Sequence, residues 1–171
     1  MPQLDVRLTS TMPTAYIETT IPSYYIARPS SSLIQAARQA STREWWDGGC
    51  SQLELVTSLE TLDEATKGDK EMASARHALL SSIQLLPVTD DVISLAERLV
   101  STGLVPAKAA SDAVHIAVAS VHCVDYLVTW NFKHIANPFL RERLRLAVSE
   151  AGFKMPIMCS PDELLQNNDD Y

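Results

Sequence analysis

Three carboxylates of this chain stand where an α/β domain would collect functional groups. Glu18 directly follows a short apolar run, residues 15–17, and Asp112 interrupts the small, apolar stretch 109–114. A charge in such a stretch is costly unless it is paired or binds a metal. Glu64 lies in an acidic run that is also typical of a solvated helix face, and Glu18 could equally be a helix cap. Carboxylate oxygens are preferred ligands of Mg²⁺ and Mn²⁺, and a metal so held can activate water and neutralise charge on a phosphate.

Further polar side chains lie close to these acids in the sequence. Asn131 directly follows the fourth apolar run of the chain. Thr19 and Thr129 could orient the first and the fourth of the candidate side chains, Glu18 and Asn131, by hydrogen bonds. Lys133 and His134 could contact a phosphate or could belong to an ordinary surface loop. These residues are therefore candidates for supporting or substrate-binding roles.

The histidine and tryptophans nearby have competing interpretations. His115 lies three residues after Asp112, on much the same helix face, although such a histidine is more often packed and hydrogen-bonded than functional. Trp45, Trp46 and Trp130 could stack nucleobases, although core or interface roles are commoner. The sequence contains no Ser-His-Asp order, phosphate loop or dinucleotide-binding glycine pattern.

The elements that must position these residues alternate between short apolar strands and helices. Thr57 or Ser58 could cap the helix that follows, and Thr57 with Glu60 has the pattern of a capping box. Gly68 and Gly103 are suited to end helices. The expected strands are residues 15–17, 53–56, 85–88, 126–130 and 156–158, and the expected helices are 32–46, 57–67, 69–83, 89–103, 106–121, 139–151 and a short one after 160. This alternation predicts a parallel sheet covered on both faces, with functional groups beyond the carboxyl ends of its strands.

Length and composition indicate one globular domain. The chain has 171 residues, of which 46% are hydrophobic and 20% charged, which suits one core. We expect the domain at 14–166, after a flexible lead-in at 1–13 that offers Met12 as an alternative start to Met1, and before a loose tail at 167–171. Neither a membrane span nor a secretory signal is recognisable.

Cysteine use and net charge bear on location and partners. Cys50, Cys123 and Cys159 are odd in number and lack metal-ligand spacing, so they indicate reduced thiols in a cytoplasmic protein. The net charge is -7, whereas simple nucleic-acid binders gain affinity from Lys and Arg. Binding to nucleic acid would therefore need a local basic patch, a bound metal or a basic partner.

Four segments, in this order, resemble the PIN-domain family, which includes the VapC toxins. They are 16–25 (YIETTIPSYY), 58–69 (SLETLDEATKGD), 112–119 (DAVHIAVA) and 124–131 (VDYLVTWN), and the likeness extends over about residues 15–165. The resemblance implies a three-layer α/β/α fold with a central, mostly parallel five-stranded sheet. It also implies an endoribonuclease that uses Mg²⁺ or Mn²⁺, with Glu18, Glu64 and Asp112 as metal ligands and Asn131 as the fourth catalytic position. Many relatives are toxins of type II toxin-antitoxin systems, so an antitoxin protein and a homodimer are implied partners besides RNA.

Two residues depart from the pattern of that family. Glu18 stands where the family usually has Asp, and Asn131 where Asp is common, so the site offers three charges instead of four. Asparagine supplies an oxygen but no charge, and could hold a water or a substrate group together with Thr129. These departures leave open a catalytically weak or inactive PIN-fold module with a binding or regulatory role. A metal-dependent phosphatase or DNA nuclease is a third possibility, because carboxylates do not themselves select the phosphoester.

Overall fold

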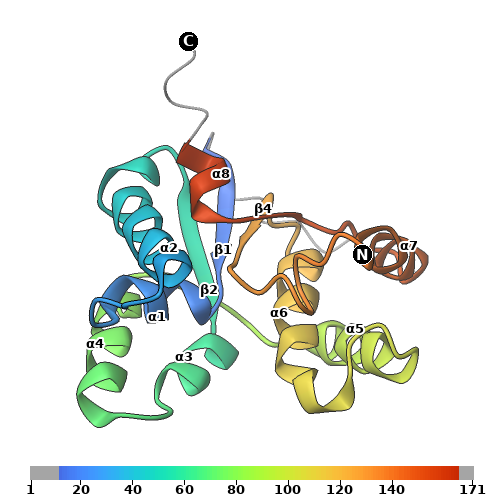
Figure 1. The fold of residues 1–171 in the computed structure, drawn as a ribbon. Helices are drawn as coiled ribbons and strands as arrows, with labels where there is room; N and C mark the ends of the chain where they lie inside the picture. Colours follow the sequence, from blue (N-terminus) through green and yellow to red (C-terminus); the bar gives the residue numbers. More distant parts are fainter. Residues whose placement is uncertain (1–11, 166–171) are drawn as a thin grey trace.

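The centre of the fold is a five-stranded sheet in which all neighbouring strands are parallel (Figure 1). The structure is a computed structural model that describes residues 12–165, so residues 1–11 of the expected lead-in and the expected tail at 167–171 lie outside the described residues. The expected α/β fold is confirmed, and its sheet is entirely parallel. In the order of the sheet the strands are β3 (Gln84–Leu86), β2 (Glu54–Ser58), β1 (Thr14–Ile17), β4 (Tyr126–Val128) and β5 (Ile157–Cys159).

Strand β1 occupies the middle of the sheet and delivers Glu18 to its carboxyl edge. Ala15 pairs with Leu55 of β2 on one side and with Tyr126 of β4 on the other. Successive side chains of a strand point to opposite faces. Tyr16 accordingly packs into one hydrophobic cluster and Ala15 into another, on the other face of the sheet. Because parallel strands end at one edge, Glu18 lies among the residues that follow β2 and β4.

Helices cover both faces of this sheet, which gives three layers (Figure 1). One layer contains α5 (Asp90–Ser101), α6 (Ala110–Val121) and α7 (Arg141–Glu150), and the other contains α1 (Thr20–Ile26), α2 (Leu33–Glu44), α3 (Leu59–Ala65), α4 (Lys70–Leu80) and α8 (Pro161–Leu165).

Local capping signals set several helix ends as the sequence predicts. The hydroxyl of Thr89 accepts a hydrogen bond from the backbone amide of Val92 at 3.4 Å, and α5 begins directly after this N-cap. Asp69 likewise accepts from the amide of Met72 at 3.1 Å and caps α4. Gly103 has a φ of 74°, the left-handed conformation that glycine adopts readily just after a helix.

The expected capping box at the start of α3 is wrong. Ser58, rather than Thr57, is the N-cap residue, and its side chain makes no capping hydrogen bond. The Thr57 hydroxyl instead donates to the carbonyl of Ile17 at 2.8 Å and ties β2 to β1. A contact between strands has therefore taken the hydroxyl that the local pattern assigned to the helix.

Three other helices differ from their expected bounds. The helix expected at 32–46 continues beyond α2 as a π-helical turn, Trp45–Gly49, in which the amide of Cys50 donates to the carbonyl of Trp45 at 2.8 Å. The helix expected from 106 opens with a 3₁₀ turn, Ala107–Ala109. The helix expected from 139 begins only at Arg141, after a turn closed on the carbonyl of Asn137.

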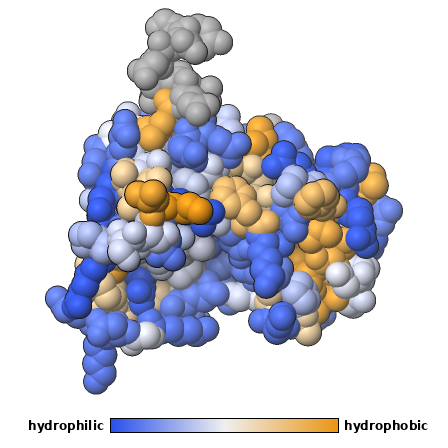
Figure 2. All heavy atoms as spheres, in the orientation of Figure 1, coloured by the Kyte–Doolittle hydropathy of each residue, from blue (hydrophilic) through white to orange (hydrophobic). Residues whose placement is uncertain are grey.

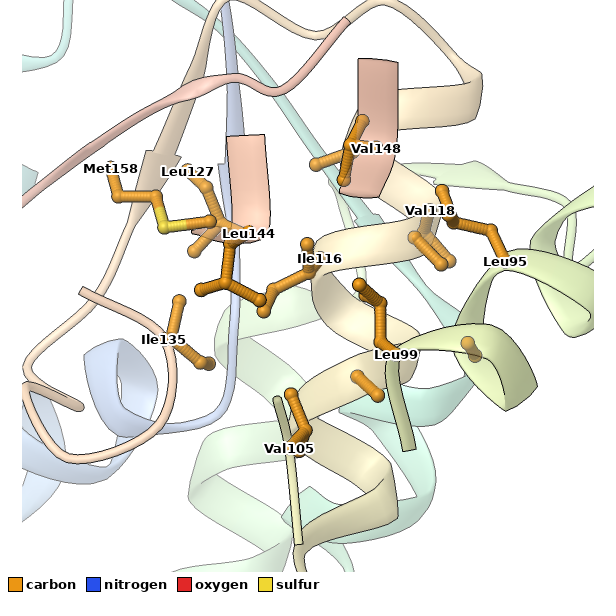
Figure 3. Close-up of a cluster of buried hydrophobic side chains, with 14 of the residues drawn as sticks. Leu95, Leu99, Val105, Ile116, Val118, Leu127, Ile135, Leu144, Val148 and Met158 are labelled. Carbon is orange, nitrogen blue, oxygen red and sulfur yellow. The ribbon is translucent and has the colours of Figure 1, made fainter. Parts of the chain in front are cut away.

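Helix α6 is the most buried helix of the layer that carries it. Ala113, Ile116 and Ala117 have no exposed surface, and Ile116 packs with Leu127 of β4 and Leu144 of α7 (Figure 3). Complete burial of a large aliphatic side chain stabilises a fold by roughly 1.5–3 kcal/mol. This packing fixes α6 against the sheet, and with it the polar side chains at the amino-terminal end of α6.

The face of the molecule seen in Figure 2 is mostly hydrophilic, with separate hydrophobic patches. Leu33 and Ile34 at the start of α2 are 87% and 68% exposed, and Phe139 is 90% exposed. Among the helices of residues 12–165, none has the length and hydrophobicity needed to cross a membrane.

Candidate functional site

Glu18 is held in place by residues that follow β1 and β4. Its side chain is almost fully buried, at 2% exposure. One carboxylate oxygen accepts from the backbone amide of Thr20 at 3.1 Å, and the other accepts from the Thr20 hydroxyl. The same hydroxyl accepts from the amide of Trp130 at 2.9 Å. Burial raises the pKa of Glu18, and the nearby charge of His115 and the Thr20 hydrogen bonds only partly oppose that rise.

Glu64 on α3 receives hydrogen bonds from the immediate neighbours of the other two acids. Its Oε2 accepts from the hydroxyl of Thr19, the residue after Glu18. Its Oε1 accepts at 2.6 Å from the hydroxyl of Ser111, the residue before Asp112. The structure therefore brings the chain around all three predicted acids together at Glu64.

A chain of hydrogen bonds links Glu64 on α3, through His115 on α6, to strands β1 and β2. His115 Nε2 lies 2.8 Å from Glu64 Oε2, and His115 Nδ1 lies 2.8 Å from the Tyr16 hydroxyl, which lies 2.7 Å from the Ser58 hydroxyl. Burial lowers the pKa of His115, but the Tyr16 oxygen and the carboxylates of Glu64 and Glu18 outweigh it and raise that pKa well above its ordinary value. A raised pKa favours the protonated form of His115, in which Nε2 donates to Glu64 and Nδ1 to Tyr16.

Asp112 at the start of α6 pairs with a loop residue. Its Oδ2 lies 2.9 Å from Nδ1 of His134, and both side chains are less than one-fifth exposed. His134, a candidate phosphate contact, therefore meets a carboxylate in this structure. The exposed Lys133 lies beside it in the same loop.

Asn131 organises this loop with its side-chain oxygen. That oxygen accepts from the backbone amides of Lys133 at 3.2 Å and His134 at 3.0 Å. The Asn131 amide in turn donates to the hydroxyl of Thr129 at 2.8 Å. No bond to the Asn131 side-chain nitrogen is formed within residues 12–165, so this nitrogen is the part of the side chain left to donate to a ligand.

The three acids have the donor chemistry of a hard-metal site but not the assembled geometry of one. Over the described range 12–165, no three or more His, Cys, Asp or Glu side chains are grouped as metal ligands. Each carboxylate oxygen can still accept through a second lone pair, and its present partners have the orienting role of outer residues in metal centres. The residues Glu18, Glu64 and Asp112 therefore fit Mg²⁺ or Mn²⁺ by the type of their donor atoms.

The tryptophans considered for base stacking are mostly buried. Trp45 has no exposed surface, and Trp130 is 8% exposed with its ring nitrogen donating to the Thr42 hydroxyl at 2.8 Å. Trp46 is partly buried and packs edge-on against Trp45. The ring faces of Trp45 and Trp130 are therefore not available for stacking with a nucleobase.

Three groups of this network are not predicted from the sequence: Thr20, Ser111 and Tyr16. Thr20, and not the predicted Thr19, binds Glu18, whereas Thr19 donates to Glu64. Ser111 could have been identified because its hydroxyl directly precedes a candidate acid in an otherwise apolar stretch. Tyr16 was counted only as a strand residue, yet its hydroxyl links His115 to Ser58. A polar end on a side chain in a buried central strand must find a partner, which was the signal available.

Comparison with known proteins assigns no family. No protein-family model matches the sequence, and no curated protein is found to be similar to it.

Proposed function

We propose that this protein is a PIN-type, metal-dependent endoribonuclease that hydrolyses RNA phosphodiesters. The observation that carries the proposal is the convergence on Glu64, whose carboxylate accepts from the residue after Glu18 and from the residue before Asp112. Three acids distant in sequence and joined at the carboxyl edge of a parallel sheet are suited to a phosphoester site. The order of the four sequence segments supports RNA as the substrate.

In this proposal Glu18, Glu64 and Asp112 would hold Mg²⁺ or Mn²⁺. When bound, the ion would supply an activated water and neutralise charge that develops on the phosphate. Thr20 fixes both oxygens of Glu18, and the ring of His115 fixes Glu64, so neither acid needs to reorient when the substrate arrives.

The loop after β4 would position the substrate. Asn131 would donate from its side-chain nitrogen to a water or a phosphate oxygen, because its oxygen already serves two backbone amides. Thr129 holds Asn131 in this orientation. Lys133 would contribute positive charge next to the acids, which an RNA needs from a protein with a net charge of -7, and His134 would contact a phosphate with its ring.

The biological role that belongs to this proposal is that of the toxin in a type II toxin-antitoxin system. An antitoxin protein and a second copy of the chain would then be its partners. This part of the proposal is supported by the sequence resemblance alone.

A non-cutting PIN-fold module with a binding or regulatory role is the alternative. It is favoured by the contact of Glu64 with His115, which already balances the charge of Glu64, and by the use of the Asn131 oxygen within its own loop. Such a module would keep the fold and the surface of the site without hydrolysis.

Cleavage of a structured RNA by the purified protein separates the two. We expect cleavage with Mn²⁺ or Mg²⁺ and none in EDTA. The substitution Asp112→Asn should abolish cleavage, because it removes a ligand charge while its amide oxygen can still accept from His134. Asp63→Asn, on the exposed side of α3 and next to Glu64 in sequence, is the matched control and should cut as wild type. Cleavage by folded Asp112→Asn at the wild-type rate would remove Asp112 from the site.

A further inference from the structure

A cation and two aromatic rings meet beside the candidate site. The guanidinium carbon of Arg38, on α2, lies 5.3 Å from the ring centroid of Trp130 and 5.4 Å from that of Phe132. The two rings are 6.1 Å apart and nearly perpendicular, with an angle of 78° between their planes. Arg38 thus lies in the corner between the rings, within range of a cation–π interaction with each.

The two rings differ in what they present to solvent. Trp130 is 8% exposed, and its ring nitrogen is committed to Thr42. Phe132 is 40% exposed, although it is a large hydrophobic residue that gains stability from burial. Arg38 is only partly buried. The surface formed by Phe132 and Arg38 is therefore accessible to solvent, while the buried ring of Trp130 packs against Phe132.

This surface is linked to the candidate carboxylate site through the backbone of residues 130–132. The amide of Trp130 donates to the Thr20 hydroxyl, which in turn donates to Glu18. Phe132 directly follows Asn131 in the chain and directly precedes the exposed Lys133. A polymer that placed a phosphate at the acids would therefore have its neighbouring units next to Phe132.

We propose that Phe132 and Arg38 form a stacking subsite for one unpaired base of an RNA strand, with Lys133 beside it for a backbone phosphate; this rests on the function proposed above. Every nucleobase has a π face that can stack on an aromatic ring, and arginine adds a cation–π contribution. The subsite would select single-stranded RNA without reading its sequence.

A base fits this surface better than an apolar protein segment does. Docking such a segment would strip water from the Arg38 guanidinium and offer it no new partner, which is costly. A base offers a π face that can stack on the exposed part of the Phe132 ring without stripping water from the guanidinium. The exposed apolar pair Leu33 and Ile34 lies on α2 before Arg38, so a protein partner is the competing outcome that the test must expose.

Fluorescence anisotropy with a short, unstructured, end-labelled RNA tests the subsite, in EDTA so that cleavage plays no part. Replacing Phe132→Leu removes the ring but keeps an apolar side chain, and should raise the Kd by roughly 5- to 100-fold, the effect of losing one stacked base. Phe132→Trp should restore binding to within about twofold of wild type. Phe139→Leu is the matched control, since Phe139 is 90% exposed and has no ring contact within residues 12–165, and should bind as wild type.

A second arm replaces the RNA by a ribose-phosphate strand without bases. Wild type and Phe132→Leu should bind this strand equally, because only the stacked base distinguishes them. The subsite is overturned by equal RNA affinity of wild type and Phe132→Leu, by absence of RNA binding by wild type, or by a loss that Phe132→Trp does not restore. A loss of affinity that Phe132→Trp does not restore would indicate that Phe132 packs against an apolar surface, as in a contact with a protein partner. Since none of these readouts needs hydrolysis, failure of the subsite is distinguishable from failure of the nuclease, which the cleavage assay reports.

Discussion

The side chains of Glu64 and His115 are in contact inside the site, with His115 Nε2 2.8 Å from Glu64 Oε2. Burial raises the pKa of Glu64, but the hydrogen bond and charge of His115, with the hydroxyls of Ser111 and Thr19, outweigh it and lower that pKa from 4.5 to about 2. An acid whose pKa falls on folding stabilises the folded state above its unfolded pKa, and this contribution is lost as the pH falls toward the folded pKa.

The metal-free protein should therefore lose stability in acid partly through Glu64. Between pH 7 and about pH 2 to 3, the free energy of unfolding of wild type should fall by about 2 to 3 kcal/mol more than that of Glu64→Gln, which has no carboxyl to protonate. Urea titrations in EDTA across this range measure the difference. Glu71→Gln, a surface change on α4, should follow the wild-type curve. An equal dependence of the free energy of unfolding on pH for wild type and Glu64→Gln would show that the partners of Glu64 do not lower its pKa.

The positions of the acids could be predicted from sequence, but their partners could not. Glu18 directly follows an apolar run and Asp112 interrupts one, so local pattern located both. The contact of His115 with Glu64, and that of His134 with Asp112, join residues 51 and 22 positions apart. Such contacts depend on how α3, α6 and the loop after β4 pack, which no local pattern encodes. The metal-binding roles of the three acids stay predictions.

Helix α1 connects the site to the layer that covers it. It begins at Thr20, which binds Glu18, and its carboxyl-terminal end is held by Arg43 of α2. The guanidinium donates to the carbonyls of Tyr25 at 2.9 Å and Ala27 at 2.7 Å. Carbonyls at a helix end lack partners within the helix, so Arg43 satisfies groups that α1 itself cannot.

We expect Arg43→Met to destabilise the protein by about 1–3 kcal/mol, because it keeps the apolar stem and leaves two carbonyls without their donor. Arg43→Lys should recover only part of this loss, since an ammonium cannot reproduce the fork of a guanidinium. Urea unfolding at pH 7 measures both. Arg143→Met, at an exposed position of α7, is the control and should stay within about 0.5 kcal/mol of wild type. A loss for Arg43→Met no larger than that of the control would refute the role of Arg43.

Among the elements, the strands could be predicted from apolar runs more accurately than the helix ends could be predicted from local patterns. All five expected strands are present because buried parallel strands are short apolar runs, and the N-caps at Thr89 and Asp69 act as local signals. The ends that were missed depend on tertiary contacts. Thr57 binds across the sheet, and the π-helical turn places Trp45 in the core beside α8. Neither contact is visible in a stretch of neighbouring residues.

The whole molecule combines an acidic net charge with a proposed polyanionic substrate. Its charge of -7 disfavours RNA at long range, so binding has to come from a small part of the surface. The loop after β4 provides Lys133 and Phe132 there, and a divalent ion at the three acids would reverse the local sign of the charge. The proposed binding and cleavage of RNA therefore depend on whether Glu18, Glu64 and Asp112 act together as one metal centre.

Thermal unfolding with and without Mn²⁺ tests this dependence most directly, because it needs no substrate. An ion at about a hundredfold excess over its Kd stabilises the folded state by about 2.7 kcal/mol, which corresponds to a rise in Tm of roughly 5 to 10 °C for a domain of this size. Wild type and Asp63→Asn should both show this rise at millimolar Mn²⁺. Asp112→Asn should gain less from Mn²⁺ than wild type does, because it has lost the charge of one ligand. A wild-type Tm that Mn²⁺ leaves unchanged would contradict the claim that the three acids form a metal centre.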